Sequence, residues 1–233
     1  NYGGTTMRLS KSYIDVGLMT NQRESMLLFW GEEVGLTFDE QLKLGGGVHQ
    51  LRHDLNGSVF KLNHARSALT DEEPTGYQGL MIADDSVEEP VTLFDPDGNR
   101  VTLVPVGYQG IDQIGIELSV RSLAAHQQFY QKVLTLEQVS DRCFLWGDTL
   151  LFLTENPQQP YCTARSGLGY RYLTVQVSDV DFEHRSAIDR GGQEGQAPQT
   201  LGETARISFI LDPDGNWIEI SQRASLTGAL PKV

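Results

Sequence analysis

A segment near the end of the chain has a near copy in the middle, and this repeat constrains the fold more than any other feature. The later copy is FILDPDGNWIEIS (residues 209–221) and the earlier one is VTLFDPDGNRVTLVP (residues 91–105). In both, DPDG places Pro at the second position of a turn and Gly where the backbone needs a positive φ, so the motif joins two strands. The motif aspartates Asp95 and Asp212 are 117 residues apart (212 − 95). The repeat predicts one ancestral unit used twice, with function where the copies differ.

The repeat extends to the start of each half. The first half opens with YIDVGLM and RESMLLFWGEEVGL, and the second with DQIGIELSV and SLAAHQQFYQKVLTL. Each pair is an alternating strand followed by a stretch with helical spacing, which predicts a helix over 23–34 in the first half. A further helix is predicted over 180–190, ended by Gly191 and Gly192, where the first half has only the link DDSVEE. Strands with few helices predict an α+β fold.

The length of 233 residues is enough for two ordinary domains. The repeat places their boundary in the stretch PVGYQGI, so we expect one domain over 7–106 and a second over 111–223. Residues 1–6 have no periodicity and are expected to form a tail without function. Because no apolar run approaches the length of a membrane span, no membrane association is expected.

The formal net charge is −13, and no cluster of Lys and Arg is visible in the sequence. Such a chain opposes the phosphate backbone, which excludes nucleic acid as an expected partner and would suit a cationic ligand. Two cysteines, Cys143 and Cys162, and the lack of a secretion signal favour a cytoplasmic, reduced protein. Cys143 has no activating pattern and is interpreted as a buried, inert thiol.

Polar side chains alternate with apolar ones on two strands of the second half. In the last strand, the period of two directs Ile218 and Ile220 to the core and Trp217 and Glu219 to the other face. In the first strand of this half, the same period places Gln113 and Glu117 opposite a row of apolar residues. Carboxylates and an amide on a concave sheet face indicate a site. His126 and His184 are interpreted as members of the polar faces of their helices.

Together, the apolar-Gly-apolar first strand, the FY-containing helix, the V-S-D-V-D segment and the closing DPDGN-x-I-E-I resemble the vicinal oxygen chelate superfamily. This superfamily includes glyoxalase I, extradiol dioxygenases, methylmalonyl-CoA epimerase and bleomycin-resistance proteins. The resemblance covers residues 9–222. It implies tandem glyoxalase-like domains built from four βαβββ modules, the first half lacking one helix, with curved mixed sheets that form cups.

The resemblance also implies where a metal would bind. In metal-using members the ligands come from three positions, which in the second half are Gln113, Tyr172 and Glu219. A tyrosine stands where histidine is usual, and the first-half positions are Asp15, Tyr77 and Thr102. Because a catalytic divalent metal needs about three protein ligands, two expectations stay open. One divalent ion is held by Gln113 and Glu219, or no metal is bound.

Two functions follow from these alternatives, both with a small-molecule partner. The first is a glyoxalase-like lyase or isomerase, with the metal in the second cup and Glu117 or Glu219 as the base. The second is a metal-free binding protein of the bleomycin-resistance type, with Phe152, Tyr172 and Trp217 around the ligand.

Three further points stay open. An extradiol dioxygenase is the weaker enzymatic variant, because both expected histidines are missing. A site in the first cup would use Lys61 and Arg100 to meet an anionic group. The chain is expected to be a monomer or a homodimer.

Overall fold

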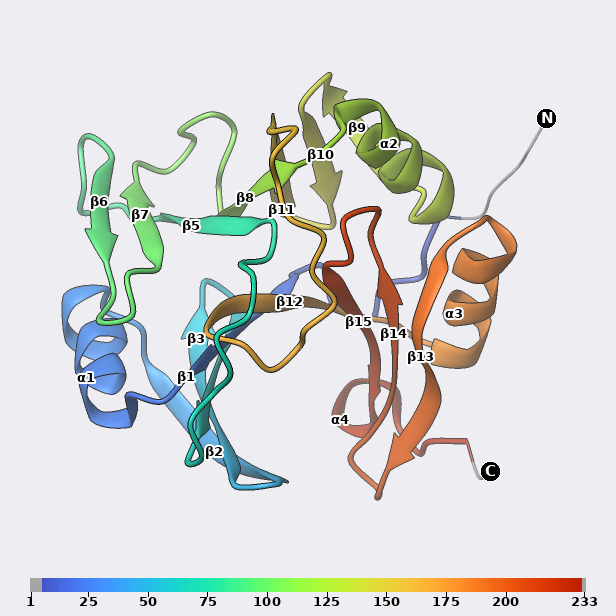
Figure 1. Cartoon of the computed structure of the whole chain (residues 1–233), viewed down its shortest axis with the longest axis horizontal. Helices are drawn as coiled ribbons and strands as arrows, with labels where there is room; N and C mark the ends of the chain where they lie inside the picture. Colours follow the sequence, from blue (N-terminus) through green and yellow to red (C-terminus); the bar gives the residue numbers. More distant parts are fainter. Residues whose placement is uncertain (1–5, 232–233) are drawn as a thin grey trace.

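The computed structural model describes residues 6–231 and consists of two β-sheets with helices packed around them (Figure 1). The larger sheet has eight strands, which are, in spatial order, β13 (Gln193–Leu201), β14 (Ala205–Leu211), β15 (Trp217–Arg223), β12 (Gly169–Gln176), β1 (Asp15–Thr20), β4 (Ser58–Ala65), β3 (Val48–Leu55) and β2 (Phe38–Gly45). The smaller has seven, which are β6 (Val91–Phe94), β7 (Arg100–Val104), β5 (Tyr77–Ala83), β8 (Ile114–Val120), β11 (Thr149–Glu155), β10 (Cys143–Trp146) and β9 (Glu137–Ser140).

Both sheets are mixed, and both contain strands from the two halves of the chain. In the eight-stranded sheet β1 pairs with β12 in antiparallel fashion, and in the seven-stranded sheet β5 pairs with β8 in the same way. The expected α+β fold with tandem glyoxalase-like architecture and curved mixed sheets is confirmed. The predicted boundary at 106–111 falls between β7 and β8, and the division into domains at this point stays a prediction.

The repeat is also visible in the helices. Helix α1 (Arg23–Leu28) continues into a π-helical turn, η1 (Phe29–Glu33), and α2 (Leu123–Gln128) continues into η2 (Phe129–Val133). The expected second-half helix is α3 (Val180–Asp189), whereas no helix forms in the first-half link at 84–89. The last helix is α4 (Ala224–Thr227). No helix within residues 6–231 is long and apolar enough to cross a membrane.

Aromatic side chains from the two π-helical turns anchor the core. Trp30 of η1 is fully buried against Phe60 of β4, with ring centroids 4.0 Å apart. Tyr130 of η2 packs in the same manner on Phe144 of β10, at 5.3 Å. Burial of large aromatic rings is a major source of folding free energy. The FW and FY pairs of the sequence repeat are therefore packing residues.

Two histidines predicted to lie on polar helix faces are buried instead. His126 of α2 is fully buried and His184 of α3 is 5% exposed. His184 Nε2 lies at hydrogen-bond distance, 2.9 Å, from Glu194 Oε2 of the neighbouring strand β13. These predictions were wrong because helical spacing alone does not show which neighbouring strand covers the polar side of a helix. Cys143 is buried, and burial raises the pKa of its thiol, as expected for an inert cysteine.

Candidate ligand-binding site in the eight-stranded sheet

The concave face of the eight-stranded sheet surrounds a cavity of about 650 Å³. Both edge strands contribute to its wall, β2 through Leu44 and β13 through Leu201, so the sheet curves around it. Alternate residues of each strand reach the cavity because side chains of a β-strand point to opposite faces in turn. The polar wall residues from β3, β4 and β15 are Gln50, Arg52, Lys61, Asn63, Glu219, Ser221 and Arg223.

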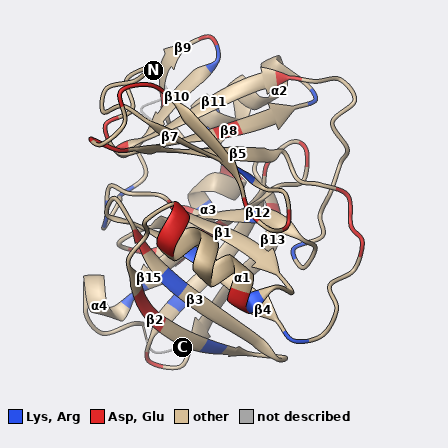
Figure 2. Ribbon diagram, turned by 90° about the vertical axis from the view of Figure 1, so that its left-hand side faces the viewer, with Lys and Arg blue, Asp and Glu red and all other residues tan. Residues whose placement is uncertain are grey.

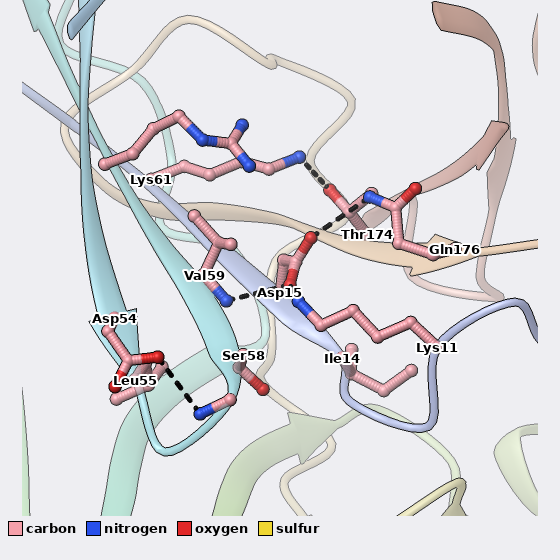
Figure 3. A network of polar contacts seen from close by, with 12 residues as sticks. Lys11, Ile14, Asp15, Asp54, Leu55, Ser58, Val59, Lys61, Thr174 and Gln176 are labelled. Atoms are coloured by element: carbon pink, nitrogen blue, oxygen red, sulfur yellow. Dashed lines mark hydrogen bonds and ion pairs between the residues drawn. The ribbon is translucent and has the colours of Figure 1, made fainter. Parts of the chain in front are cut away.

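At the wall of this cavity an ammonium group, a hydroxyl and a carboxylate form one hydrogen-bonded group. Lys61 Nζ donates to Thr174 Oγ1 at 2.7 Å and to Glu219 Oε2 at 3.0 Å. The Thr174 hydroxyl donates in turn to Glu219 Oε2 at 2.6 Å. Lys61 is only 4% exposed, and Figure 3 shows it extending across β1 to Thr174. The charge of Glu219 is thus balanced by a buried lysine from the other half of the chain.

Asp15 lies beside this group but has a different role. Its carboxylate accepts hydrogen bonds from the Val59 backbone N–H at 2.8 Å, from Lys11 Nζ at 3.0 Å and from Gln176 Nε2 at 3.2 Å (Figure 3). The side chain is fully buried. Because these partners come from three segments, Asp15 links β1, β4 and β12 through hydrogen bonds that the protein itself supplies.

Tyr172 is held by an amide network on the same wall. Its hydroxyl accepts from Asn63 Nδ2 at 3.0 Å and from Gln50 Nε2 at 3.4 Å. Burial, followed by the charge of Glu219, raises the pKa of this phenol, so Tyr172 stays neutral. Its ring packs directly over Gly17, where an added Cβ would be 2.3 Å from the ring. Only glycine therefore allows Tyr172 to lie flat at this place.

Arg165 and Phe209 line the side of the cavity near β14, and Trp217 contacts both of them. The Trp217 indole donates to the Thr163 carbonyl at 2.8 Å and contacts Phe209 edge to face, with centroids 5.3 Å apart. The guanidinium of Arg165 lies 4.6 Å from the centre of the Phe209 ring and 5.1 Å from that of Trp217. The aromatic pair thus holds a cation at the cavity wall.

The remaining residues predicted for the site lie in, or directly before, strands of the seven-stranded sheet. Gln113 is buried, donates to Ser58 Oγ at 2.7 Å and accepts from Thr149 Oγ1 at 3.1 Å. Glu117 forms an ion pair with Arg100 Nη2 at 2.8 Å, near a second, open cavity of about 490 Å³ that Arg100 lines. Phe152 belongs to β11 and packs over Gly115.

The structure therefore separates the predicted residues into two groups. Glu219, Tyr172 and Trp217 lie in the eight-stranded sheet, whereas Glu117 and Phe152 lie in the other and Gln113 directly precedes its strand β8. The expected pair of metal ligands, Gln113 and Glu219, is not brought together. The reason is that β12 pairs with β1. The last strand, β15, lies next to β12 and therefore belongs to the same sheet as β1, whereas β8 belongs to the other sheet.

The donor set at Glu219 does not fit a divalent metal ion. Its Oε2 is engaged by the Lys61 ammonium and the Thr174 hydroxyl. A protonated lysine has no lone pair to offer a metal and repels it. Within residues 6–231, no three His, Cys, Asp or Glu side chains are grouped as metal ligands require. The chemistry of this cavity thus has to be sought in its own charged side chains.

The sequence interpretation missed the wall residues Arg52 and Arg223, and also Thr174, which hydrogen-bonds to Lys61 and Glu219. Lys61 was connected with an anionic group, but together with Arg100, which lies in the other sheet. The alternation of Gln50 and Arg52 on a strand was a signal that could have indicated a polar cavity wall. The neighbours of these residues depend on strand order, for which the sequence carries no local signal.

This architecture was compared with known protein families. Residues 110–220 match the family model described as the Glyoxalase/Bleomycin resistance protein/Dioxygenase superfamily. The matched segment comprises 111 (220 − 110 + 1) of the 233 residues. The vicinal oxygen chelate resemblance, which the sequence motifs indicated, is confirmed. No curated protein matches the chain by sequence.

Solved structures extend the glyoxalase-like fold to nearly the whole chain. Glyoxalase I from Zea mays superposes with a TM-score of 0.72, covering 93% of this chain and 92% of its own at 15% identity. A Bacillus subtilis protein described as a candidate dioxygenase has a TM-score of 0.64, covering 94% and 86% at 13% identity. The cppA protein from Streptococcus pneumoniae has a TM-score of 0.54, covering 94% and 99% at 12% identity. At these identities the likeness concerns the fold.

Proposed function

We propose that the eight-stranded cup is a metal-independent binding site for a small organic molecule. The observation that carries this proposal is the Lys61–Glu219 pair, in which a buried ammonium group is bonded to the carboxylate and would repel a metal ion there. The cavity of about 650 Å³ is within the range of small-molecule sites, and its wall combines apolar side chains with a few polar groups. Of the two functions expected from the sequence, the metal-free binding protein agrees best with this geometry.

Narrowing the cup should abolish ligand binding. Ser221 and Ile207 are wall residues on paired positions of β15 and β14, so Ser221→Trp or Ile207→Trp would place an indole in the cavity. A ligand present at about 100 times its Kd stabilises a protein by about 2.7 kcal/mol, a rise in Tm of about 5–10 °C for a chain of this size. In a thermal-shift screen, compounds that stabilise the wild type should lose this effect in both variants, and a chelator should not change it.

The second cavity offers a matched control. Gln78 is exposed and lines that cavity, so Gln78→Trp introduces the same side chain at a distant site. We expect it to leave the ligand-induced shift intact. A shift lost in Gln78→Trp and kept in both cup variants would move the site to the seven-stranded sheet, and a shift abolished by chelator would contradict metal independence.

A proton-transfer enzyme is the second candidate, and one observation favours it. Glu219 uses Oε2 for Lys61 and Thr174, and Oε1 takes part in neither contact. In this proposal Glu219 would remove a proton from carbon beside a carbonyl group, and the Lys61 ammonium would stabilise the enolate oxygen. The class is the lyase or isomerase expected from the sequence, with lysine in place of a metal.

Deuterium exchange tests this second candidate without a known substrate. A panel of 2-oxo acids in D2O would be followed by NMR for exchange at the carbon next to the carbonyl. We expect Glu219→Gln to slow any protein-catalysed exchange by about 100-fold or more, since general base catalysis contributes on that order. Glu117→Gln, in the other sheet, is the control and should leave the rate unchanged. Exchange unaffected by Glu219→Gln would leave ligand binding as the function of the cup.

A further inference from the structure

The cavity wall has the opposite charge to the protein as a whole. The chain carries 31 Asp and Glu against 18 Lys and Arg, a formal net charge of −13. The wall has five basic residues, which are Lys43, Arg52, Lys61, Arg165 and Arg223, and one carboxylate, Glu219. Figure 2 shows blue segments near the labels β3 and β15 on the strands of this sheet. The net negative charge of the chain led to the expectation of a cationic ligand, but the excess of basic residues on this wall disfavours one.

The protein neutralises only part of this positive charge. Lys61 pairs with Glu219 at 3.0 Å, and Arg52 Nε lies 3.3 Å from Glu40 Oε1, a carboxylate with a half-exposed side chain. For Arg223, no carboxylate within residues 6–231 lies within ion-pair distance. At least one cation on the wall is therefore available to a ligand.

Arg52 is a buried cation whose charge the protein compensates only in part. It is 6% exposed, and although Nη1 donates to Gln50 Oε1 at 3.0 Å, Nε has no hydrogen-bond partner among the described residues. Burial and then the charge of Arg223 lower the pKa of Arg52, and the nearby carboxylates of Asp15, Glu40 and Glu219 offset this only in part. A buried guanidinium next to a second cation is unfavourable unless an anion compensates it. Carboxylate, sulfonate and phosphate groups suit arginine especially well because they accept two parallel hydrogen bonds.

The rim of the cavity is apolar. Leu44 on β2 and Leu201 on β13 are large exposed side chains, 53% and 45% exposed, on the two edges of the sheet. Val48 and Ile207 continue this apolar surface inward. Exposed leucines that face a common cavity from both edges can bury the apolar body of a ligand.

We infer that the cup binds an amphipathic organic anion, with its acidic group at Arg52 and Arg223 and its apolar body between the two leucine-bearing edges. This inference rests on the proposed binding function and specifies the chemical class of the ligand. It requires no covalent step. A carboxylate, sulfonate or phosphate on an aliphatic or aromatic body meets the description.

A pair of fluorescent probes separates charge from shape. 8-Anilinonaphthalene-1-sulfonate and N-phenyl-1-naphthylamine share an aromatic skeleton, and only the first carries an anionic group. Titration of the full chain should give a Kd at least about 10-fold lower for the sulfonate, since one charge-assisted hydrogen bond contributes on the order of 1.4 kcal/mol or more. Arg223→Gln should remove most of this difference, and added salt should weaken sulfonate binding alone.

Arg142 provides the matched charge control, because it is exposed, lies in the turn between β9 and β10 and does not line the cup. Arg142→Gln should leave both affinities unchanged. Equal affinity for the two probes, with both displaced in Ser221→Trp, would overturn the anion inference and leave the cup as a binding site. Binding of neither probe, or binding unchanged in Ser221→Trp, would overturn both this inference and the proposed function.

Discussion

His126 is a buried imidazole between two aspartates of the second DPDGN turn. Its Nε2 lies 3.4 Å from Asp212 Oδ2 and 3.6 Å from Asp214 Oδ2, and its Nδ1 lies 3.0 Å from the Ser122 carbonyl oxygen. Burial alone would lower the pKa of His126, but the contacts with Asp212, Ser122 and Asp214 outweigh it and raise the pKa above the ordinary value of 6.5. The motif that resembles a functional signature thus also holds a helix to a turn through charge.

The raised pKa predicts a pH-dependent contribution to stability. A group whose pKa is higher in the folded state stabilises it fully below the unfolded pKa, and this stabilisation is lost as the pH rises through the folded pKa. The free energy of unfolding lost in His126→Gln should therefore be larger at pH 5.5 than at pH 8.5, as measured by urea unfolding. His53 is the control because burial lowers its pKa, so His53→Gln should cost more at the higher pH. The same trend for both variants would contradict the assignment.

The sequence motifs single out individual residues but do not show their partners, and the site role of these residues stays a prediction. Glu219 and Tyr172 were found because each has a fixed place in a repeated motif, and both line the cavity. Gln113 matched its motif equally well, yet its amide serves to connect β4 and β11. A motif predicts the position of a residue within its module. It does not predict which other module supplies the facing charge, and Lys61 is 158 positions away from Glu219.

Among the elements, those with a strong local signal were predicted closely. Strands β6 and β7 follow the residues expected from the DPDG turn, whose Asp95 accepts from the backbone N–H groups of Asp97 and Asn99 while Gly98 adopts a φ of +85°. The second turn repeats this geometry around Asp212. Side-chain bonds of this kind explain why the motif is locally specified.

The strands that were missed are edge strands. The segments β2, β9 and β13 are mostly exposed and lack the alternation that marks a half-buried strand. They are strands only because a neighbour supplies hydrogen bonds, which the sequence does not show. Two of them, β2 and β13, carry the leucines at the rim of the cup. The elements that the sequence predicts least well thus include the two strands that form the apolar rim of the cavity.

On the scale of the whole molecule, neither sheet belongs to one half of the chain. The strands β1–β4 pair with β12–β15 through β1 and β12, and the strands β5–β7 pair with β8–β11 through β5 and β8. Each half supplies one wall of the cup, since Lys61 and Arg52 come from the first and Glu219 and Arg223 from the second. The repeat in the sequence therefore describes the single units, whereas the cavity is formed across them.

From this arrangement we expect that the second half, residues 111–223, does not fold on its own as a stable monomer. A fragment of residues 111–223 would expose the edges of β8 and β12, which pair with β5 and β1 in the whole chain. Unpaired central strands invite association with another chain. We expect this fragment to form dimers or aggregates, measured by size-exclusion chromatography with light scattering. When the 7–106 fragment is refolded with it, the two fragments should form a 1:1 complex with the mass of one chain. A monomeric 111–223 fragment with cooperative unfolding would contradict this and show that each half folds alone.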